Sequence, residues 1–373
     1  MVYFSKSKTG LLLEERRHFF LDTGFHPVQI TRVIPRASSE NSGSFCVMKL
    51  VNIVSQIPSS VWERELPQGL PWSFTHSNTA VDAEIHVIYG LRQPLRVPNS
   101  WENTFFVASE PPDIRVYNIS ILSRYRAVLG PSYEYLAGYS NFSPVTAVAP
   151  WWAGMKAGGE EHYGSVDDRV ALRREDFETG FAPERDIITA IVSQKAKTNL
   201  QQQRLRLVDY LSAHLSQFEV YGLAAEQVED KADVLGTSRY HLAIENSSHP
   251  GYWTEKLSDP ILMDNVTFYG GHPTAWDYFK GESVVGIDPW NPEETYRTIS
   301  EALNDRTWEA SREARTANRR ALLDSYSFHR VLSSFLSTKS WEPSRGKMIS
   351  IPAQHAKSRL KKFTDPVYRR LFS

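Results

Sequence analysis

The residues best suited to chemistry lie in the segment 239–271, where a predicted strand runs into a loop rich in Gly, Pro and His and then into a helix. Thr254 can cap that helix, whose unpaired N–H groups and dipole attract an anion such as phosphate. Lys256 adds a positive charge, and Glu255 can accept hydrogen bonds from ribose hydroxyls. On spacing alone, the alternative stays open that Thr254 and Glu255 only cap the helix and that Lys256 is solvated.

Other signatures of nucleotide and metal chemistry are missing from the sequence. It contains no G-x-x-x-x-G-K-[ST] loop, no G-x-G-x-x-G, no D-x-D pair and no H-E-x-x-H. The eleven histidines are dispersed. His249 and His272 are the best candidates for a site, although each suits an ordinary loop position better. We therefore expect no metal site and no cofactor.

Hydrophobic runs alternate with amphipathic helices around this segment. Strands are predicted over 187–193, 218–221, 240–244, 266–269 and 284–287, and helices over 200–214, 252–263, 274–279 and 292–303, with a last helical stretch over 305–336. This alternation predicts an α/β fold with a doubly wound, mostly parallel sheet, whose ligands bind beyond the carboxyl ends of the strands.

The rest of the chain predicts a second domain before this one. Its length of 373 residues exceeds what one hydrophobic core usually serves. Further strands are predicted over 47–54, 83–89, 104–108 and 124–130, and another is possible over 25–34. We expect an N-terminal domain over 1–150, a linker and loop over 151–183, a C-terminal domain over 184–336 and a basic tail over 337–373.

The chemical segment resembles a known family. The run Leu242-Ala243-Ile244-Glu245-Asn246-Ser247, then Tyr252-Trp253-Thr254-Glu255-Lys256, then Val266 to Gly271 with Pro273, is similar to the hallmark of the family 10 fucosyltransferases, the alpha-1,3/1,4 enzymes. The family motif reads F-E-N-S, then Y-x-T-E-K and a G-x-P segment, so Ile244 is a mild departure. The resemblance extends over 188–288 and, more weakly, over 105–136.

The resemblance implies a GT-B architecture of two Rossmann-like domains facing a cleft. It also implies GDP-fucose as the donor in the C-terminal domain, an acceptor sugar in the N-terminal one and no metal requirement. The family arginine that grips the donor diphosphate corresponds to Arg204, with Arg206 as its competitor two residues on. Arg204 and Lys256 would then stabilise the departing diphosphate.

The same resemblance assigns the remaining donor contacts. Tyr252 and Glu255 match positions that contact the nucleoside, and Asn246 matches one near the sugar and phosphate. Glu245 is open to a structural role instead, in which it orients the loop.

The catalytic base is expected after a strand of the N-terminal domain. Glu110, in the run FFVASEPP, matches the acidic residue of the family's E-S-P segment and would remove the acceptor hydroxyl proton in an inverting transfer. Taken alone, Glu110 before two prolines favours a surface turn, and only the resemblance gives the catalytic role equal weight. Trp151 and Trp152 are candidates for stacking on an acceptor sugar or for bracing the interdomain packing.

The charge distribution predicts a separate role for the C-terminus. The net charge of the whole chain is −1, but residues 339–373 carry nine basic and two acidic side chains and therefore +7. This basic amphipathic pattern suits a helical tail that binds anionic lipid peripherally, as in bacterial members of the family; a solubilising tail or a helix docked on the body stays open. With one cysteine, no signal peptide and no apolar membrane span, we expect a cytoplasmic protein that associates with the inner face of a membrane.

Together these observations predict an inverting, metal-independent enzyme that moves fucose from GDP-fucose to a hydroxyl of an oligosaccharide or glycolipid, such as a lipopolysaccharide. Its expected partners are the nucleotide sugar, the glycan acceptor and the anionic membrane, and not nucleic acid. Two alternatives stay open: the same fold with another nucleotide sugar, and a catalytically silent glycan- or nucleotide-binding protein.

Overall fold

The computed structural model describes residues 49–79, 81–90, 94–98, 100–146, 148–157, 166–167, 171–222, 228–338 and 348–352. The possible strand at 25–34 lies outside these residues, as does most of the basic tail. The described part of the tail is a strand, β15 (Met348–Ile351), which pairs antiparallel with β4 (Leu95–Pro98). No helix among the described residues is long and apolar enough to cross a membrane.

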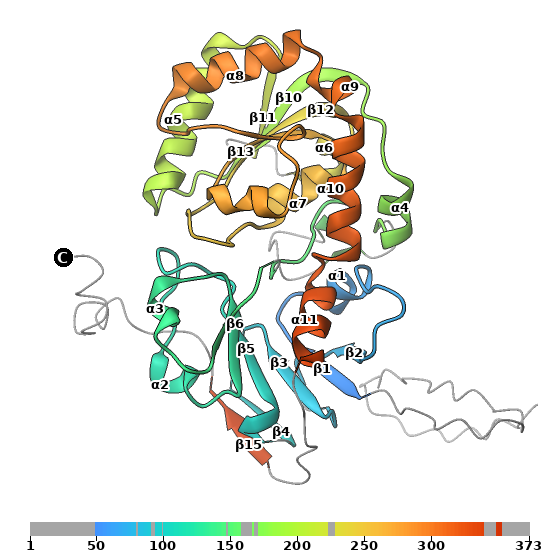
Figure 1. Ribbon diagram of the computed structural model, residues 1–373, viewed down its shortest axis with the longest axis vertical. Coiled ribbons are helices and arrows are strands. Elements are labelled where there is room, and N and C mark those ends of the chain that lie inside the picture. Colours follow the sequence, from blue (N-terminus) through green and yellow to red (C-terminus); the bar gives the residue numbers. More distant parts are fainter. Residues whose placement is uncertain are drawn as a thin grey trace, which may run out of the picture. The chain divides into compact units, whose positions relative to one another are not determined.

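The first lobe is built on a parallel sheet of six strands in the order β2-β1-β3-β5-β6-β7 (Figure 1). These strands are β1 (Leu50–Val54), β2 (Ser73–His76), β3 (Ile85–Ile88), β5 (Thr104–Val107), β6 (Ala127–Gly130) and β7 (Phe142–Pro144). Its short helices are α1 (Ser59–Glu63), η1 (Trp101–Asn103), α2 (Ile119–Leu122) and α3 (Glu134–Ala137). The four strands predicted between residues 47 and 130 are confirmed; β3 and β5 consist wholly of buried residues, which is why their sequences are largely apolar.

The second lobe holds a parallel sheet of five strands in the order β11-β10-β12-β13-β14. These strands are β10 (Arg185–Ile191), β11 (Phe218–Tyr221), β12 (Ser238–Ile244), β13 (Val266–Gly270) and β14 (Val284–Gly286). Its helices are α5 (Asn199–His214), α6 (Lys231–Leu235), α7 (Glu255–Leu262) and α8 (Pro292–Asn304). The predicted doubly wound sheet is confirmed, with two differences: the helix expected at 274–279 is a 3-10 turn, η3 (Pro273–Asp277), and the short helix α6 was not predicted.

The predicted linker at 151–183 contains structure of its own. It includes a small hairpin, β8 (Lys156–Ala157) with β9 (Val166–Asp167), and a helix, α4 (Arg174–Thr179). Its first residues are held from the first lobe by Arg64, which donates to the carbonyl oxygens of Trp151 and Ala153. Glu65 accepts a hydrogen bond from the Trp151 N–H, and burial raises the pKa of Glu65 to about 8. The linker is therefore fixed to the first lobe by buried polar contacts.

Three helices follow the second sheet where one helical stretch was expected over 305–336. These are α9 (Thr307–Ala310), α10 (Arg312–Asp324) and α11 (Phe328–Ser337). Although α11 follows the second lobe in sequence, Phe328, Leu332 and Leu336 belong to the buried cluster under the first sheet (Figure 1). The packing thus associates α11 with the first lobe, and the boundary expected at residue 336 stays a prediction.

A pair of buried histidines fixes α11 to the first sheet. His76 at the end of β2 and His329 of α11 have their Nε2 atoms 2.8 Å apart, so one ring donates to the other. Burial lowers the pKa of His76 to about 4, and it lowers the pKa of His329 well below its usual range. Both rings are thus neutral near pH 7, and one of them must gain a proton in acid.

This pair predicts acid-sensitive docking of α11. Because the folded pKa of His76 lies below its unfolded value near 6.5, the unfolded chain binds more protons as the pH falls from 6.5 towards 4. We expect the free energy of unfolding to fall by about 2 kcal/mol more between pH 7.5 and pH 5 in the wild type than in His76→Gln. Urea titrations at the two pH values measure this difference. The exposed His214→Gln is the control, and equal losses in all three proteins would contradict the prediction.

Candidate active site

Hydrogen bonds join the loops that follow the carboxyl ends of the strands in the two sheets. Asp113, in the loop after β5, accepts hydrogen bonds from the Ser247 hydroxyl and from His249 Nε2, the latter at 3.0 Å. The Ser132 N–H, after β6, donates to the carbonyl oxygen of Pro250 at 3.0 Å. Because ligands of parallel sheets bind beyond the carboxyl ends of the strands, these contacts mark the candidate site.

The start of α7 has the cap that the sequence predicted. The Thr254 hydroxyl oxygen accepts from the Lys256 N–H at 3.3 Å. The Glu245 carboxylate is fully buried and accepts from both the N–H and the hydroxyl of Thr254, each at 2.8 Å. Glu245 therefore orients the loop and the helix start, and this geometry favours the structural role over ligand contact.

A charged network surrounds the first turn of α7. Lys256 Nζ lies 2.9 Å from Glu255 Oε1, and Lys231 Nζ lies 3.7 Å from the same oxygen. Burial opposes the ionisation of Glu255, but the two lysines outweigh it and hold its pKa well below the usual range. Glu255 is thus held ionised next to a cation, and its role in binding a ligand stays a prediction.

Arg204 contacts the side chain of Asn246. It projects from α5, is 4% exposed, and donates to Asn246 Oδ1 at 3.2 Å and to the carbonyl oxygens of Ser193 and Lys195 at 3.3 Å. Arg204 and Lys256 also line one small cavity of about 20 Å³, which has room for a single water-sized group. Arg206 is exposed, so the helix turns it away from the buried network that holds Asn246.

Glu110 lies within electrostatic reach of the α7 charges. Burial raises its pKa, while the positive charges of Arg115 and Lys256 act in the opposite direction. Its backbone N–H donates to the Tyr117 hydroxyl oxygen at 3.1 Å, which fixes the turn. The charge of Lys256, in the second lobe, therefore acts on a carboxylate of the first lobe.

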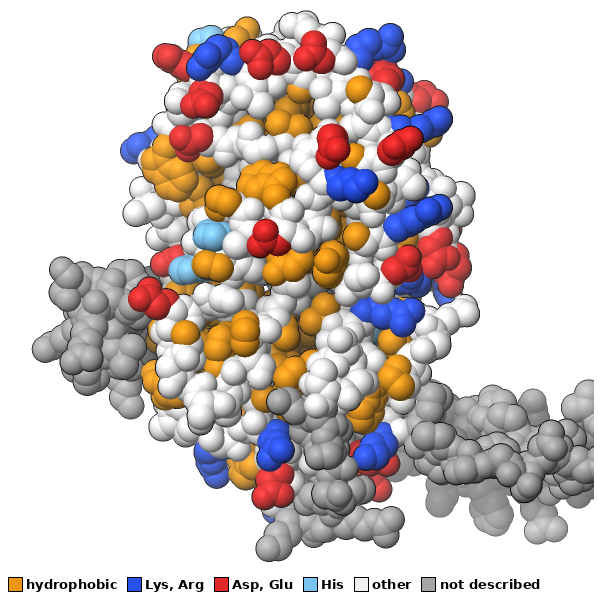
Figure 2. Space-filling model, viewed as in Figure 1, with side chains coloured by type: hydrophobic (Ala, Val, Ile, Leu, Met, Phe, Trp, Pro, Cys, Tyr) orange, Lys and Arg blue, Asp and Glu red, His pale blue; other side chains and the backbone are white. Residues whose placement is uncertain are grey.

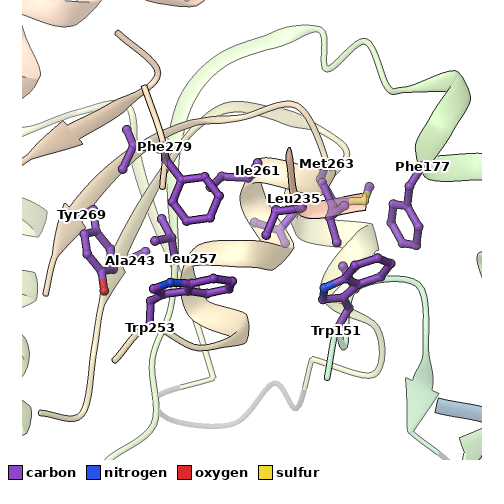
Figure 3. Close-up of a cluster of buried hydrophobic side chains, with 14 of the residues drawn as sticks. Trp151, Phe177, Leu235, Ala243, Trp253, Leu257, Ile261, Met263, Tyr269 and Phe279 are labelled. Carbon is purple, nitrogen blue, oxygen red and sulfur yellow. The ribbon is translucent and has the colours of Figure 1, made fainter. Parts of the chain in front are cut away.

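Three predicted contacts are less accessible than expected. Tyr252 is 3% exposed and belongs to the buried cluster of the first lobe, with its ring centroid 6.4 Å from that of Tyr133. Trp151 is 1% exposed within the cluster drawn in Figure 3, where it packs on Phe177. Trp152 is half-buried, and its N–H donates to Asp259 Oδ1 at 2.9 Å. Trp151 thus braces the packing and does not stack on an acceptor, while the donor role of Tyr252 stays a prediction.

One site residue was missed in the sequence. Asp113 joins the two lobes, yet no motif marks it. Its signal was position alone, because it follows β5 by a few residues in the same loop as Glu110. Among the residues that the structure describes, no three His, Cys, Asp or Glu side chains gather as a metal-binding group.

Two Rossmann-like lobes whose carboxyl-end loops are joined by hydrogen bonds form the arrangement of the GT-B fold. Residues 182–295, which hold most of the second lobe, match the family model described as glycosyltransferase family 10 (fucosyltransferase), C-terminal, and this match indicates a glycosyltransferase.

Solved structures with a similar arrangement include an alpha1,3-fucosyltransferase with GDP, at 15% identity and a TM-score of 0.44, covering 81% of this chain and 93% of that one. The same enzyme type with GDP-fucose gives 13% identity and a TM-score of 0.43, with the same coverage. A glycosyltransferase from Rickettsia africae gives 9% identity and a TM-score of 0.44, covering 79% of this chain and 98% of that one.

Proposed function

We propose that the protein transfers fucose from GDP-fucose to a glycan hydroxyl, with inversion at the anomeric carbon and without a metal ion. The observation that carries the proposal is the match of residues 182–295 to family 10, with Glu110 of the first lobe near enough to the start of α7 for Lys256 to lower its pKa. Fold alone would not support this function, because many activities share such lobes.

The donor diphosphate is proposed to bind at the first turn of α7. The N–H groups of a helix start and the charge of Lys256 attract phosphate oxygens there. Glu255, held ionised by its two lysines, accepts hydrogen bonds from the ribose hydroxyls. Arg204 contributes positive charge, and its hydrogen bond to Asn246 Oδ1 keeps the loop after β12 in position.

Glu110 is proposed as the general base. Its carboxylate takes the proton of the acceptor hydroxyl while that oxygen forms a bond to the anomeric carbon of the sugar. The bond from that carbon to the diphosphate breaks on the opposite face, and Lys256 and Arg204 stabilise the charge that the departing oxygen gains. The raised pKa of Glu110 makes it a stronger base than a carboxylate in water.

A thermal-shift panel of nucleotides tests the donor. GDP at about 100 times its Kd should stabilise the protein by about 2.7 kcal/mol and raise Tm by a few degrees. UDP, CMP and the free sugars should leave Tm unchanged. The addition of EDTA should not remove the GDP shift. A response to UDP and none to GDP would overturn the donor assignment in favour of another nucleotide sugar, and binding of GDP-fucose without turnover would favour a silent binding protein.

A further inference from the structure

A cavity of about 420 Å³ lies beside the candidate site, between the two lobes. From the first lobe it is lined by Ser132, after β6, and by Thr146, after β7. From the second lobe it is lined by Gly251 and Tyr278, and the corner between α10 and α11 closes one side. Figure 2 shows a hollow near the middle of this face, with hydrophobic side chains in its depth. Its volume falls in the range of ligand-binding pockets.

The lining of this cavity carries no charge. Hydroxyl groups surround it, from Ser132, Thr146, Tyr278, Ser325, Tyr326 and Ser334, and Val331 and Phe335 of α11 add apolar surface. Hydroxyl groups both donate and accept hydrogen bonds, and aromatic rings offer flat apolar faces. A ligand that matches both has many hydroxyls, apolar C–H faces and no charge, which describes a neutral saccharide.

The aromatic part of the cavity is held rigidly. The rings of Tyr278 and Tyr326 meet edge to face with centroids 5.3 Å apart. The Tyr278 hydroxyl is hydrogen-bonded to the Thr146 side chain, whose own hydroxyl donates to the Gly251 carbonyl oxygen at 3.0 Å. The second lobe and the loop after β7 therefore fix one wall together, so little ordering is needed when a ligand binds.

The cavity lies along the same sheet edge as Glu110. Glu110 follows β5, while Ser132 and Thr146 follow β6 and β7, which are the next two strands of the sheet. Adjacent strands are about 4.8 Å apart, so the cavity lies along the sheet edge at about 5 to 10 Å from β5, the strand that Glu110 follows. An acceptor with its reacting hydroxyl at Glu110 can extend along this edge into the cavity.

We propose that the cavity binds an uncharged saccharide unit of the acceptor, away from the reacting hydroxyl, and selects acceptors by length. This inference rests on the proposed function, because that function places the reacting hydroxyl of the acceptor at Glu110. The corner between α10 and α11 lies outside residues 182–295, so the C-terminal helices contribute to this selectivity together with Gly251 and Tyr278 of the matched segment.

Filling the cavity tests the proposal. Ser334→Trp places an indole on the exposed, cavity-facing side of α11, and Ser140→Trp makes the same change at an exposed serine outside the cavity. Binding to the full chain is measured by saturation-transfer NMR in the presence of GDP, with lactose, a neutral tetrasaccharide and a carboxylated tetrasaccharide as probes. We expect Ser334→Trp to weaken binding of the neutral tetrasaccharide by about tenfold or more, and Ser140→Trp to leave it unchanged.

The outcomes separate this proposal from the proposed function. Equal binding of the tetrasaccharide by Ser334→Trp and the wild type would overturn the cavity assignment while the thermal shift with GDP stayed intact. Preference for the carboxylated probe would overturn the neutral class of ligand. A failure of GDP to bind would overturn the donor assignment, and it would be detected without any saccharide. The Tm of Ser334→Trp shows whether this variant is folded. Val331→Trp is a second variant that fills the same cavity.

Discussion

Replacement of Glu110 by Gln is expected to lower kcat by a factor of about 10² to 10⁴, the usual contribution of a positioned base. The amide keeps the shape of the carboxylate but cannot take the acceptor proton. Because Glu110 is half-buried and its carboxylate has no ion pair among those that the structure describes, the substitution should leave Tm nearly unchanged. Initial rates with a glycan acceptor, and GDP binding by thermal shift, measure the two effects separately.

The pH dependence sharpens this test. Burial raises the pKa of Glu110 above its ordinary 4.5, so wild-type kcat/KM should fall in acid with a midpoint above that value, as the base becomes protonated. The variant should lose this limb of the profile. Glu134→Gln, at an exposed position in the first turn of α3, is the matched control. Full turnover by Glu110→Gln would remove it from the mechanism.

Arg204→Met is expected to lower kcat/KM by a factor of about 10² to 10³, since it removes a cation from the site where the diphosphate departs. It also removes the donors that hold Asn246 Oδ1 and the loop after β10. The donor KM should therefore rise together with the fall in kcat. Steady-state rates at several GDP-fucose concentrations distinguish the two contributions.

Two further variants distinguish a loss of catalysis from a loss of folding. Arg206→Met, two residues along α5 on its exposed side, should keep full activity. Lys256→Met, at a half-buried position, should lose activity to a similar degree while its Tm changes less than that of Arg204→Met. If Arg206→Met lost activity and Arg204→Met kept it, the arginine assignment would be reversed.

The regular parts of both lobes could be predicted because local pattern decides them. Continuous apolar runs such as 104–108 are buried on both faces of a parallel sheet, and the cap at Thr254 acts on neighbouring backbone groups. Candidate site residues followed from position after strands and from the motif; the charge of Lys256 acts on the pKa of Glu110, and the roles of both residues stay predictions.

What could not be predicted depends on contacts between residues far apart in the chain. Tyr252 lies within a donor-like motif, yet its ring is buried in the cluster of the first lobe. Trp151 looked available in a Gly-rich linker, but Glu65 holds its N–H and Phe177 packs on its ring. The cavity at the α10–α11 corner gathers residues from 132 to 338, and no local pattern records such a gathering.

The position of α11 has a consequence for synthesis of the chain. The first sheet is complete once β7 has been made at Pro144, but its buried cluster still lacks Phe328, Leu332 and Leu336. β4 likewise gains its partner strand only when β15 (Met348–Ile351) has been made. Domains usually fold in order as they leave the ribosome. Here the first lobe is translated first, but its packing is completed only by the last segments of the chain. The apolar face that α11 covers therefore stays exposed while the whole second lobe is translated.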